Sequence, residues 1–251
     1  MDAAHDEAFT ILEQLHTEAG RFEPLIELYL GRLETRDLPS EKTELLRKIA
    51  KVFEEKLGDK NQALDALMQA LEIDIFDKET PKHLDQMAQD TRRWPEVLNT
   101  VNGWLKGETD PQRKIRLCLL LAKWYGDDLN RPDYAQPMYQ QIIQLDPDNV
   151  GALRQMAQLY RKSGDLQRYG QTLTKGLEVA STDADQKEIL TELGELLDGQ
   201  MNQPEQALTH FQRALKVDGF FLPALVNLER IYETRGQNRE LVDILQRKVQ
   251  A

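Results

Sequence analysis

The chain repeats itself every 72 residues, and this period limits its possible folds more than any other feature. Three of the repeated columns are Ala63, Ala135 and Ala207; Phe22, Trp94 and Leu166; and Asp2, Asp74, Asp146 and Asp218. A fixed period of this length is typical of supersecondary units that stack on one another rather than of a single globular core. It also favours a binding protein over an enzyme.

The repeat predicts the domain organisation. Three full units span 21–92, 93–164 and 165–236, with partial units at 1–20 and 237–251. Because the repeat continues from one end to the other, we expect one continuous solenoid domain over residues 1–251. Both ends fall inside a repeat, as they would in a piece of a longer array.

Within each unit the apolar residues follow helical spacing. Leu190, Leu193 and Leu197 lie at i, i+3 and i+7, which indicates an amphipathic helix. No segment shows convincing strand-like alternation. Proline and glycine separate the periodic segments, so the sequence predicts fourteen helices. Their expected ranges are 5–19, 22–36, 40–57, 60–73, 77–91, 94–106, 111–127, 132–145, 148–163, 166–179, 183–199, 204–217, 220–235 and 238–249.

The signals at the helix ends agree with these ranges. Pro147 cannot continue a helix, and Asp148 or Asn149 offers an N-cap to the next one. Pro132 and Pro204 stand at expected first turns, where the missing amide hydrogen costs nothing. The short connections favour antiparallel packing of successive helices.

Composition excludes several classes of function. The chain has 32 Lys and Arg against 43 Asp and Glu, a net charge of −11, which argues against sequence-independent binding to nucleic acid or an anionic membrane. The sequence contains no segment that is long and apolar enough to span a bilayer, and the acidic N-terminus does not resemble a signal peptide. The single cysteine, Cys118, lies in an apolar run and is expected to be a buried thiol. We expect a cytoplasmic location.

Two sequence patterns resemble the tetratricopeptide repeat. The second-helix pattern of that family is matched by Ala135, Tyr139, Ile142, Ile143 and Pro147, and the first-helix pattern by Leu153, Met156, Ala157, Tyr160 and Gly164. The resemblance covers the whole chain. It implies an all-α, right-handed α-solenoid of about seven antiparallel helix hairpins, as in long bacterial scaffold arrays. It also implies a non-enzymatic protein–protein interaction scaffold, in which the first helix of each hairpin lines a concave groove.

Some columns depart from the family pattern. Glu13, Asp85 and Glu229 stand in the column of Ala157, where the family prefers a small residue. The family's usual alanine is replaced by a large residue in a second column, which contains Leu25, Val97, Tyr169 and Leu241. Each 72-residue unit therefore resembles two divergent hairpins, one of them closer to the family consensus.

The resemblance assigns the partner-binding positions to the first helices. Carried over to this sequence, the groove residues are Arg116, Lys123, Arg154, Gln155, Gln158, Arg161 and Lys162, with Arg47, Lys48 and Lys51 extending the positive charge. Two neighbouring first helices lack acids altogether, whereas the following one carries Glu188, Glu192, Glu195 and Asp198. One interpretation is a polarised groove that binds a peptide or protein with an acidic segment. The alternatives are solvated faces or structural salt bridges between neighbouring first helices.

A second hypothesis concerns the C-terminal end of the array. The last predicted helix presents Leu241, Ile244, Leu245 and Val249, with no polar capping helix after it in this sequence. An uncovered solenoid end exposes apolar surface, so the chain is a candidate for self-association or for a structural spacer. A homo-oligomer formed through such ends is the expectation under this hypothesis.

Catalytic and metal chemistry find little support. None of the four histidines has a second histidine at i+4, and the sequence contains no phosphate-binding loop after a strand. We therefore predict no catalytic residue, no metal and no cofactor. An α/α-toroid hydrolase stays a third alternative, which would need acids converging in one cavity. The columns predict that Trp94 and Trp124 are core residues and that Trp104 is exposed enough for a contact role.

Overall fold

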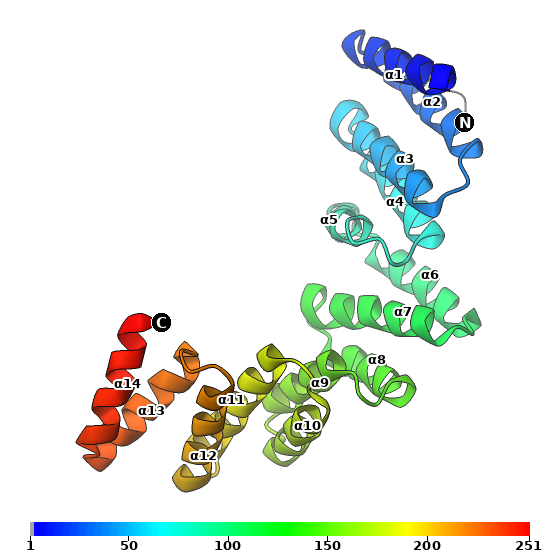
Figure 1. Ribbon diagram of the computed structural model, residues 1–251. Helices are drawn as coiled ribbons and strands as arrows, with labels where there is room; N and C mark the ends of the chain where they lie inside the picture. The colour runs from blue at the N-terminus through cyan, green and yellow to red at the C-terminus, as the bar shows by residue number, and fades with distance from the viewer. Residues whose placement is uncertain (1–2) are drawn as a thin grey trace. The chain divides into compact units, whose positions relative to one another are not determined.

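The computed structural model describes residues 3–251 and the side chains from Asp6 onward. Residues 1 and 2, which belong to the predicted first partial unit, lie outside the described residues. Within the described part the chain is all α-helical, with seven helix pairs packed as antiparallel hairpins in a tetratricopeptide-like fold (Figure 1). The predicted fold class is confirmed.

Fourteen α-helices follow one another along residues 3–251. They are α1 (Ala3–Glu18), α2 (Phe22–Glu34), α3 (Pro39–Val52), α4 (Lys60–Ile73), α5 (Thr80–Thr91), α6 (Trp94–Gly107), α7 (Pro111–Lys123), α8 (Pro132–Leu145), α9 (Val150–Ser163), α10 (Leu166–Val179), α11 (Asp183–Gly199), α12 (Pro204–Val217), α13 (Leu222–Arg235) and α14 (Asn238–Gln250). Every predicted helix is present, and the ends differ from the expected ranges by a few residues. Odd-numbered helices are the first helices of the hairpins and even-numbered helices the second.

Two helices end in a wider turn than the periodicity indicates. α3 and α7 are continued by π-helical segments, η1 (Phe53–Leu57) and η2 (Trp124–Asp128). In η2 the amide of Leu129 donates to the carbonyl of Trp124 at 2.9 Å. The two segments fall at almost the same place in the repeat, because Phe53 and Tyr125 are 72 residues apart. The spacing of apolar residues over one turn does not distinguish a π-helical turn from an α-helical one.

The left-handed backbone positions also follow the repeat. In the described chain they form two columns spaced by 72 residues, Gly20, Arg92, Gly164 and Gly236, and Gly58, Asn130 and Asn202. A left-handed residue after a helix lets the next amides reach the last carbonyls, and glycine adopts it without a steric penalty. Arg92, with φ of 59°, carries a Cβ in a conformation that the equivalent glycines adopt freely. Among the described residues, the period therefore specifies how the first helix of each hairpin ends as well as where it packs.

Capping side chains begin several helices as the sequence predicts. The Asn149 side chain accepts a hydrogen bond from the amide of Ala152 at 2.9 Å, so Asn149 rather than Asp148 is the N-cap of α9. Pro132 and Pro204 stand at the first turns of α8 and α12. These residues satisfy or remove amide donors that have no partner inside the helix.

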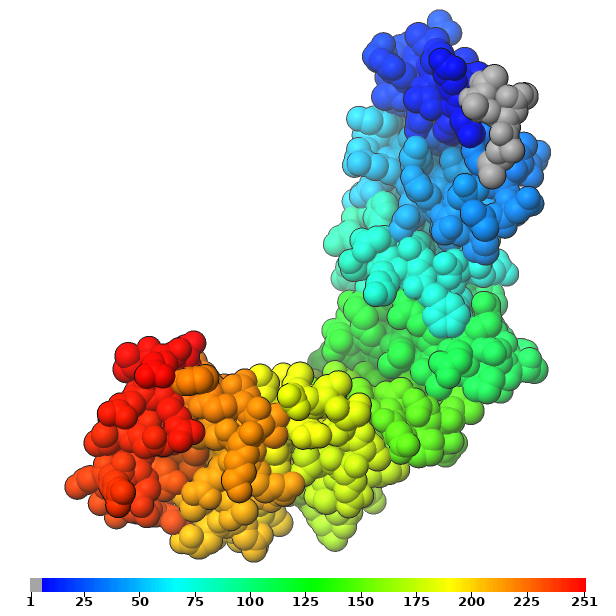
Figure 2. All heavy atoms as spheres, in the orientation of Figure 1, coloured from blue at the N-terminus to red at the C-terminus, as the bar shows by residue number. Residues whose placement is uncertain are grey.

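The chain forms two compact units, one ending at Asn130 and the other beginning at Arg131. The first contains α1 to α7, and the second contains α8 to α14. Within each unit, side chains fill the spaces between neighbouring ribbons (Figure 2). A single continuous solenoid through Asn130 stays a prediction.

The core consists of the repeated columns. Ala63, Ala135 and Ala207 are all fully buried. Trp94 and Trp124 are buried as predicted, with ring centroids 5.8 Å apart. A Cβ built on Gly194 would lie 2.5 Å from Cε1 of the fully buried Phe211, so only glycine fits there without moving the ring. Small residues in these columns let the helices approach closely.

No helix within the described residues is long and apolar enough to cross a membrane.

Candidate functional site: the first-helix face and the second-helix grooves

Within each of the two units, charged pairs join neighbouring first helices along the first-helix face. In the unit of residues 131–251, α9 contacts α11 through Arg154 and Glu192, whose Nη2 and Oε1 atoms are 3.1 Å apart. α11 contacts α13 through Asn227, which donates to Glu195 at 3.3 Å, and through an ion pair of Arg230 with Asp198. The polar residues of this face are therefore partly used to hold neighbouring repeats together.

Arg154 lies at the centre of the most extensive of these networks. Its Nη1 atom is 2.6 Å from Oε2 of Glu188 and 3.8 Å from Oδ1 of Asp185. Glu192 also accepts hydrogen bonds from Gln158 at 2.6 Å and from the hydroxyl of Tyr169 at 3.2 Å. Thus two of the four acids that reverse the charge on α11, Glu188 and Glu192, are partners of the predicted groove cation Arg154. The alternative of structural ion pairs describes Arg154 and Gln158 in this structure.

Burial and charge act together on Tyr169. Its burial and the nearby carboxylate of Glu192 raise the pKa of the Tyr169 hydroxyl to about 12. The hydroxyl is therefore a hydrogen-bond donor to Glu192 throughout the physiological pH range. This bond ties the second helix α10 to the first-helix network.

The predicted cations of α3 are also paired. The Nη1 atom of Arg47 is 2.9 Å from Oδ2 of Asp77, and the Nζ atom of Lys48 is 2.8 Å from Oε1 of Glu13. Lys51 lies 3.8 Å from a carboxylate oxygen of Glu55 on the same helix turn and is largely exposed. Arg47 and Lys48 thus join α3 to its neighbours on either side.

Arg116 and Lys123 of α7 have similar roles. Arg116 donates from Nε to the carbonyl of Ile75 at 2.7 Å and from Nη2 to that of Asp77 at 3.2 Å, and its partial burial lowers its pKa. Lys123 pairs with Asp85 at 2.5 Å and with Asp128 at 3.1 Å. Arg116 is therefore used to fix the turn before α5, a role that the sequence does not indicate.

Three predicted groove residues remain open to solvent. Gln155 and Lys162 are exposed on α9, and neither takes part in an ion pair among the described residues. Arg161 is also exposed, and its guanidinium carbon lies 6.0 Å from the centre of the Tyr169 ring. Of the ten predicted groove positions, these three are the ones that a partner can reach without breaking a charged contact.

The acids in the small-residue column have partners that sequence reasoning missed. Glu13 accepts hydrogen bonds from Lys48 at 2.8 Å and from the Tyr29 hydroxyl at 2.7 Å. Asp85 pairs with Lys123 and accepts a bond from the indole of Trp124 at 2.5 Å. Glu229 forms an ion pair with Lys248. The sequence did carry a signal for these contacts, because the family has a small residue in this column. An acid there is partly buried and therefore needs a partner.

The predicted self-association residues differ in accessibility. Ile244 is 4% exposed and belongs to the core of the last hairpin, and Leu241 packs against that core. Leu245 is 39% exposed, and its neighbours Val242 and Val249 on the same face are more exposed still. The accessible apolar stripe of α14 is therefore Val242, Leu245 and Val249, of which the sequence indicated Leu245 and Val249.

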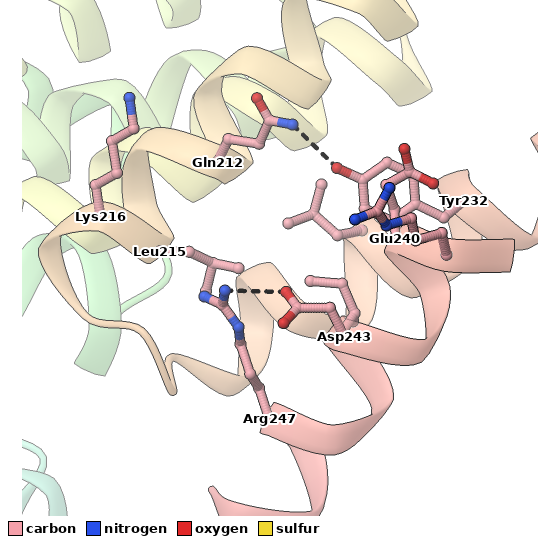
Figure 3. Close-up of a pocket in the computed structure, with 10 residues that line it drawn as sticks. Gln212, Leu215, Lys216, Tyr232, Glu240, Asp243 and Arg247 are labelled. Carbon is pink, nitrogen blue, oxygen red and sulfur yellow. Dashed lines mark hydrogen bonds and ion pairs between the residues drawn. The ribbon is translucent and has the colours of Figure 1, made fainter. Parts of the chain in front are cut away.

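A groove runs along the second-helix face between α12 and α14, with α13 as its floor (Figure 3). Its volume is about 600 Å³. Figure 3 shows Gln212 and Lys216 on the α12 wall and Asp243 and Arg247 on the α14 wall. Gln212 donates to the hydroxyl of Tyr232 at 3.0 Å. We call this space the α12–α14 groove.

A second groove of the same kind lies between α8 and α10, above α9, with a volume of about 550 Å³. Eight of its lining residues are each 72 residues before a lining residue of the α12–α14 groove. The pairs are Gln140 and Gln212, Ile143 and Leu215, Gln144 and Lys216, Met156 and Leu228, Tyr160 and Tyr232, Gln171 and Asp243, Thr172 and Ile244, and Lys175 and Arg247. The 72-residue period could have indicated that these positions are equivalent. The sequence does not show that α8 and α10, or α12 and α14, are far enough apart to leave a groove between them.

Catalytic chemistry finds few candidates among the described residues. No group of three or more His, Cys, Asp or Glu residues there is arranged to hold a metal ion. Cys118 is fully buried as predicted, and burial raises the pKa of its thiol to about 11. A thiol with a raised pKa is a poor nucleophile at neutral pH.

Comparisons with known families match the whole of the second unit, residues 131–251, and parts of the first. Models described as the tetratricopeptide repeat match residues 48–74 and 224–251. A model described as the TT21 fifth ARM repeats domain matches residues 128–233. A comparison with curated proteins finds no match.

Several solved structures are similar to this chain at low sequence identity. A tetratricopeptide repeat protein from Parabacteroides merdae is 19% identical, with a TM-score of 0.50, and the match covers 81% of this chain and 78% of that one. YrrB, described as a TPR protein with an unusual peptide-binding site, is 17% identical with a TM-score of 0.45, covering 78% and 95%. MamA is 16% identical with a TM-score of 0.43, covering 80% and 93%.

Proposed function

The chain is a tetratricopeptide-repeat protein, and we propose that it is a non-enzymatic scaffold that binds a peptide or protein partner on its first-helix face. Proteins of this family are generally interaction scaffolds and typically non-catalytic. The observation that carries the proposal is the exposed polar cluster of Gln155, Arg161 and Lys162 on α9. These side chains are held on a rigid helix and are not used in ion pairs within the described chain.

The contrast between columns supports a binding role for this face. The core columns agree from unit to unit, whereas the surface columns of the first helices change sign. Position 116 is Arg and its equivalent 188 is Glu, and position 123 is Lys where 195 is Glu. Neighbouring first helices use part of this reversal for ion pairs with each other, and the exposed cations Arg161 and Lys162 lie outside the ion pairs of the described residues, where a partner can reach them.

We infer that the partner presents a carboxylate near the C-terminal end of α9. Arg161 and Lys162 stand in the last turn of that helix, and both are exposed. Arg and Lys side chains bind carboxylates through charge-assisted hydrogen bonds, and the amide of Gln155 can bond to a peptide backbone. The cations of α3 and α7 contribute less, because a partner would have to displace their present carboxylates.

The test is capture of the native partner by charge-reversed protein. A partner isolated with the wild-type chain should be recovered at least tenfold less by the double variant Arg161→Glu and Lys162→Glu. The matched control is Lys106→Glu, an exposed reversal on the second helix α6 that lines neither proposed site, which should capture normally. All proteins should show the same helical content. Unchanged recovery by the double variant would overturn the proposal.

Self-association is a second candidate, and the exposed stripe Val242, Leu245 and Val249 on α14 favours it. Large exposed apolar surfaces on a helix mark contact sites. If this stripe joins two copies, the mass measured by light scattering should rise with protein concentration. The rise should be lost in the double variant Leu245→Asp and Val249→Asp. A constant monomer mass at every concentration would remove this candidate.

A further inference from the structure

We propose that residues 131–251 carry a second binding site on the second-helix face, formed by the α8–α10 and α12–α14 grooves. Its ligand is a peptide segment of a partner protein in which a large apolar side chain stands beside a carboxylate. This site is separate from the one proposed on the first helices, and the two can fail independently.

The two grooves have the shape and lining of side-chain pockets. Their floors are apolar, with Leu153 and Met156 in the α8–α10 groove and Leu228 and Ile244 in the α12–α14 groove. The walls carry amide, hydroxyl and cationic groups. Volumes of about 550 and 600 Å³ lie in the range of small-molecule and peptide side-chain sites.

The charge of the grooves is opposite to that of the chain. None of the residues that line the α8–α10 groove is acidic, and Lys175 on its rim forms no ion pair among the described residues. In the α12–α14 groove, Lys216 and Arg239 are likewise unpaired within the described chain, whereas Arg247 lies 2.9 Å from Asp243. In a protein of net charge −11, these cations favour an acidic ligand.

The equivalent position in the other unit shows what a closed groove looks like. Between α4 and α6 the remaining volume is about 150 Å³. Arg93 crosses it to pair with Asp65 at 2.8 Å and with Glu96 at 2.6 Å, and Trp104 lines it. In the second unit the column of Trp104 holds Gly176 and Lys248, and neither residue lines an open groove. The open grooves are thus a property of particular residues and not of the fold.

The wall residues favour an extended peptide. Gln140, Gln144 and Gln171 surround the α8–α10 groove, and each amide can donate to a carbonyl and accept from an amide of a peptide backbone. The apolar side chain would lie on the floor, and the carboxylate would meet the column of Lys175 and Arg247. Because the two grooves repeat at 72 residues, a partner with two such segments gains avidity without any new contact.

The experiment uses the full chain and two fluorescent peptides. One has a leucine–phenylalanine pair flanked by glutamates, and the other has the same pair flanked by lysines. Fluorescence polarisation should show saturable binding of the acidic peptide and at least tenfold weaker binding of the basic one. The double variant Lys175→Glu and Arg247→Glu should weaken the acidic peptide at least tenfold. Methyl NMR shifts should appear at Ile143 and Met156.

Matched variants separate this site from the first-helix site. Arg161→Glu with Lys162→Glu should leave the shifts at Ile143 and Met156 as they are in the wild type. If Arg247→Glu disturbs folding, Lys175→Glu alone should still abolish the shifts at Met156 while leaving those at Leu228. Absence of saturable binding overturns the inference. So does equal binding by the groove variant, or loss of the Met156 shift in the first-helix variant.

Discussion

Gly194 is the residue whose identity the packing restricts most sharply. A methyl group there would approach the Phe211 ring to 2.5 Å, and the ring is fully buried. We predict that Gly194→Ala lowers the free energy of unfolding by roughly 1–3 kcal/mol, because overpacking forces a buried ring from its position. The control is Gly103→Ala, where a methyl group meets no atom within 4 Å. It should raise stability by about 0.5–1 kcal/mol. Equal denaturant midpoints for both variants would contradict this account.

The pKa values of Asp85 and Glu13, two acids in the same repeat column, are expected to shift in opposite directions. Burial raises the pKa of Asp85 above its ordinary value of 3.8, and the bonds from Lys123 and Trp124 offset this only in part. Burial acts likewise on Glu13, but the bonds from Lys48 and Tyr29 outweigh it and lower the pKa below 4.5. Glu13 therefore stabilises the fold above its unfolded pKa, and this contribution is lost as pH falls through its folded pKa.

The sign is reversed for Asp85. Because its folded pKa lies above the unfolded one, ionisation of Asp85 opposes folding as pH rises from the unfolded to the folded value. Carboxyl-carbon NMR titration of the native protein checks both directions. We expect a midpoint above 3.8 for Asp85 and below 4.5 for Glu13. If both pKa values shift in the same direction, burial and hydrogen bonding do not set them in the way described.

At the scale of the helices, ion pairs between first helices fix the spacing of neighbouring repeats. Arg154 and Glu192 join α9 to α11, and both side chains are largely buried at the contact. A double-mutant cycle with Arg154→Ala and Glu192→Ala should give a coupling free energy of about 1 kcal/mol. The control pair is Arg131 and Asp133, which are exposed and close in sequence and should give a value near zero. A coupling free energy near zero for Arg154 and Glu192 would contradict this account, because the contact would then add no stability.

The sequence predicts the helices well because their causes are local. Apolar spacing, Asn149 as a cap and Pro132 at a first turn all act within one or two helical turns. The π-helical turns η1 and η2 were missed, since the same side-chain pattern suits both turn types. The partners of the site residues were also missed. Lys123 meets Asp85 across 38 residues, and such a pairing depends on how neighbouring hairpins pack.

At the scale of the molecule, we propose that the two units form one continuous solenoid. In repeat arrays each hairpin is stabilised by its neighbours, so removing residues 1–130 should remove one interface from the rest. We predict that residues 131–251 alone keep their helical content, because two core clusters lie wholly within that segment, but unfold at a lower denaturant concentration than the same segment in the full chain. Circular dichroism checks the first point and hydrogen exchange the second. Identical stability in both contexts would mean that the units are independent.

The central claim is that the 72-residue period builds the scaffold, while the residues that differ within it select the partner. The most direct test scores every substitution in residues 148–200 twice, for folded abundance and for capture of the partner isolated with the wild-type chain. Substitutions in buried columns should lose both. Substitutions at Gln155, Arg161 and Lys162 should lose capture alone. If no position loses capture alone, or if such positions are spread evenly over every face, the claim is contradicted.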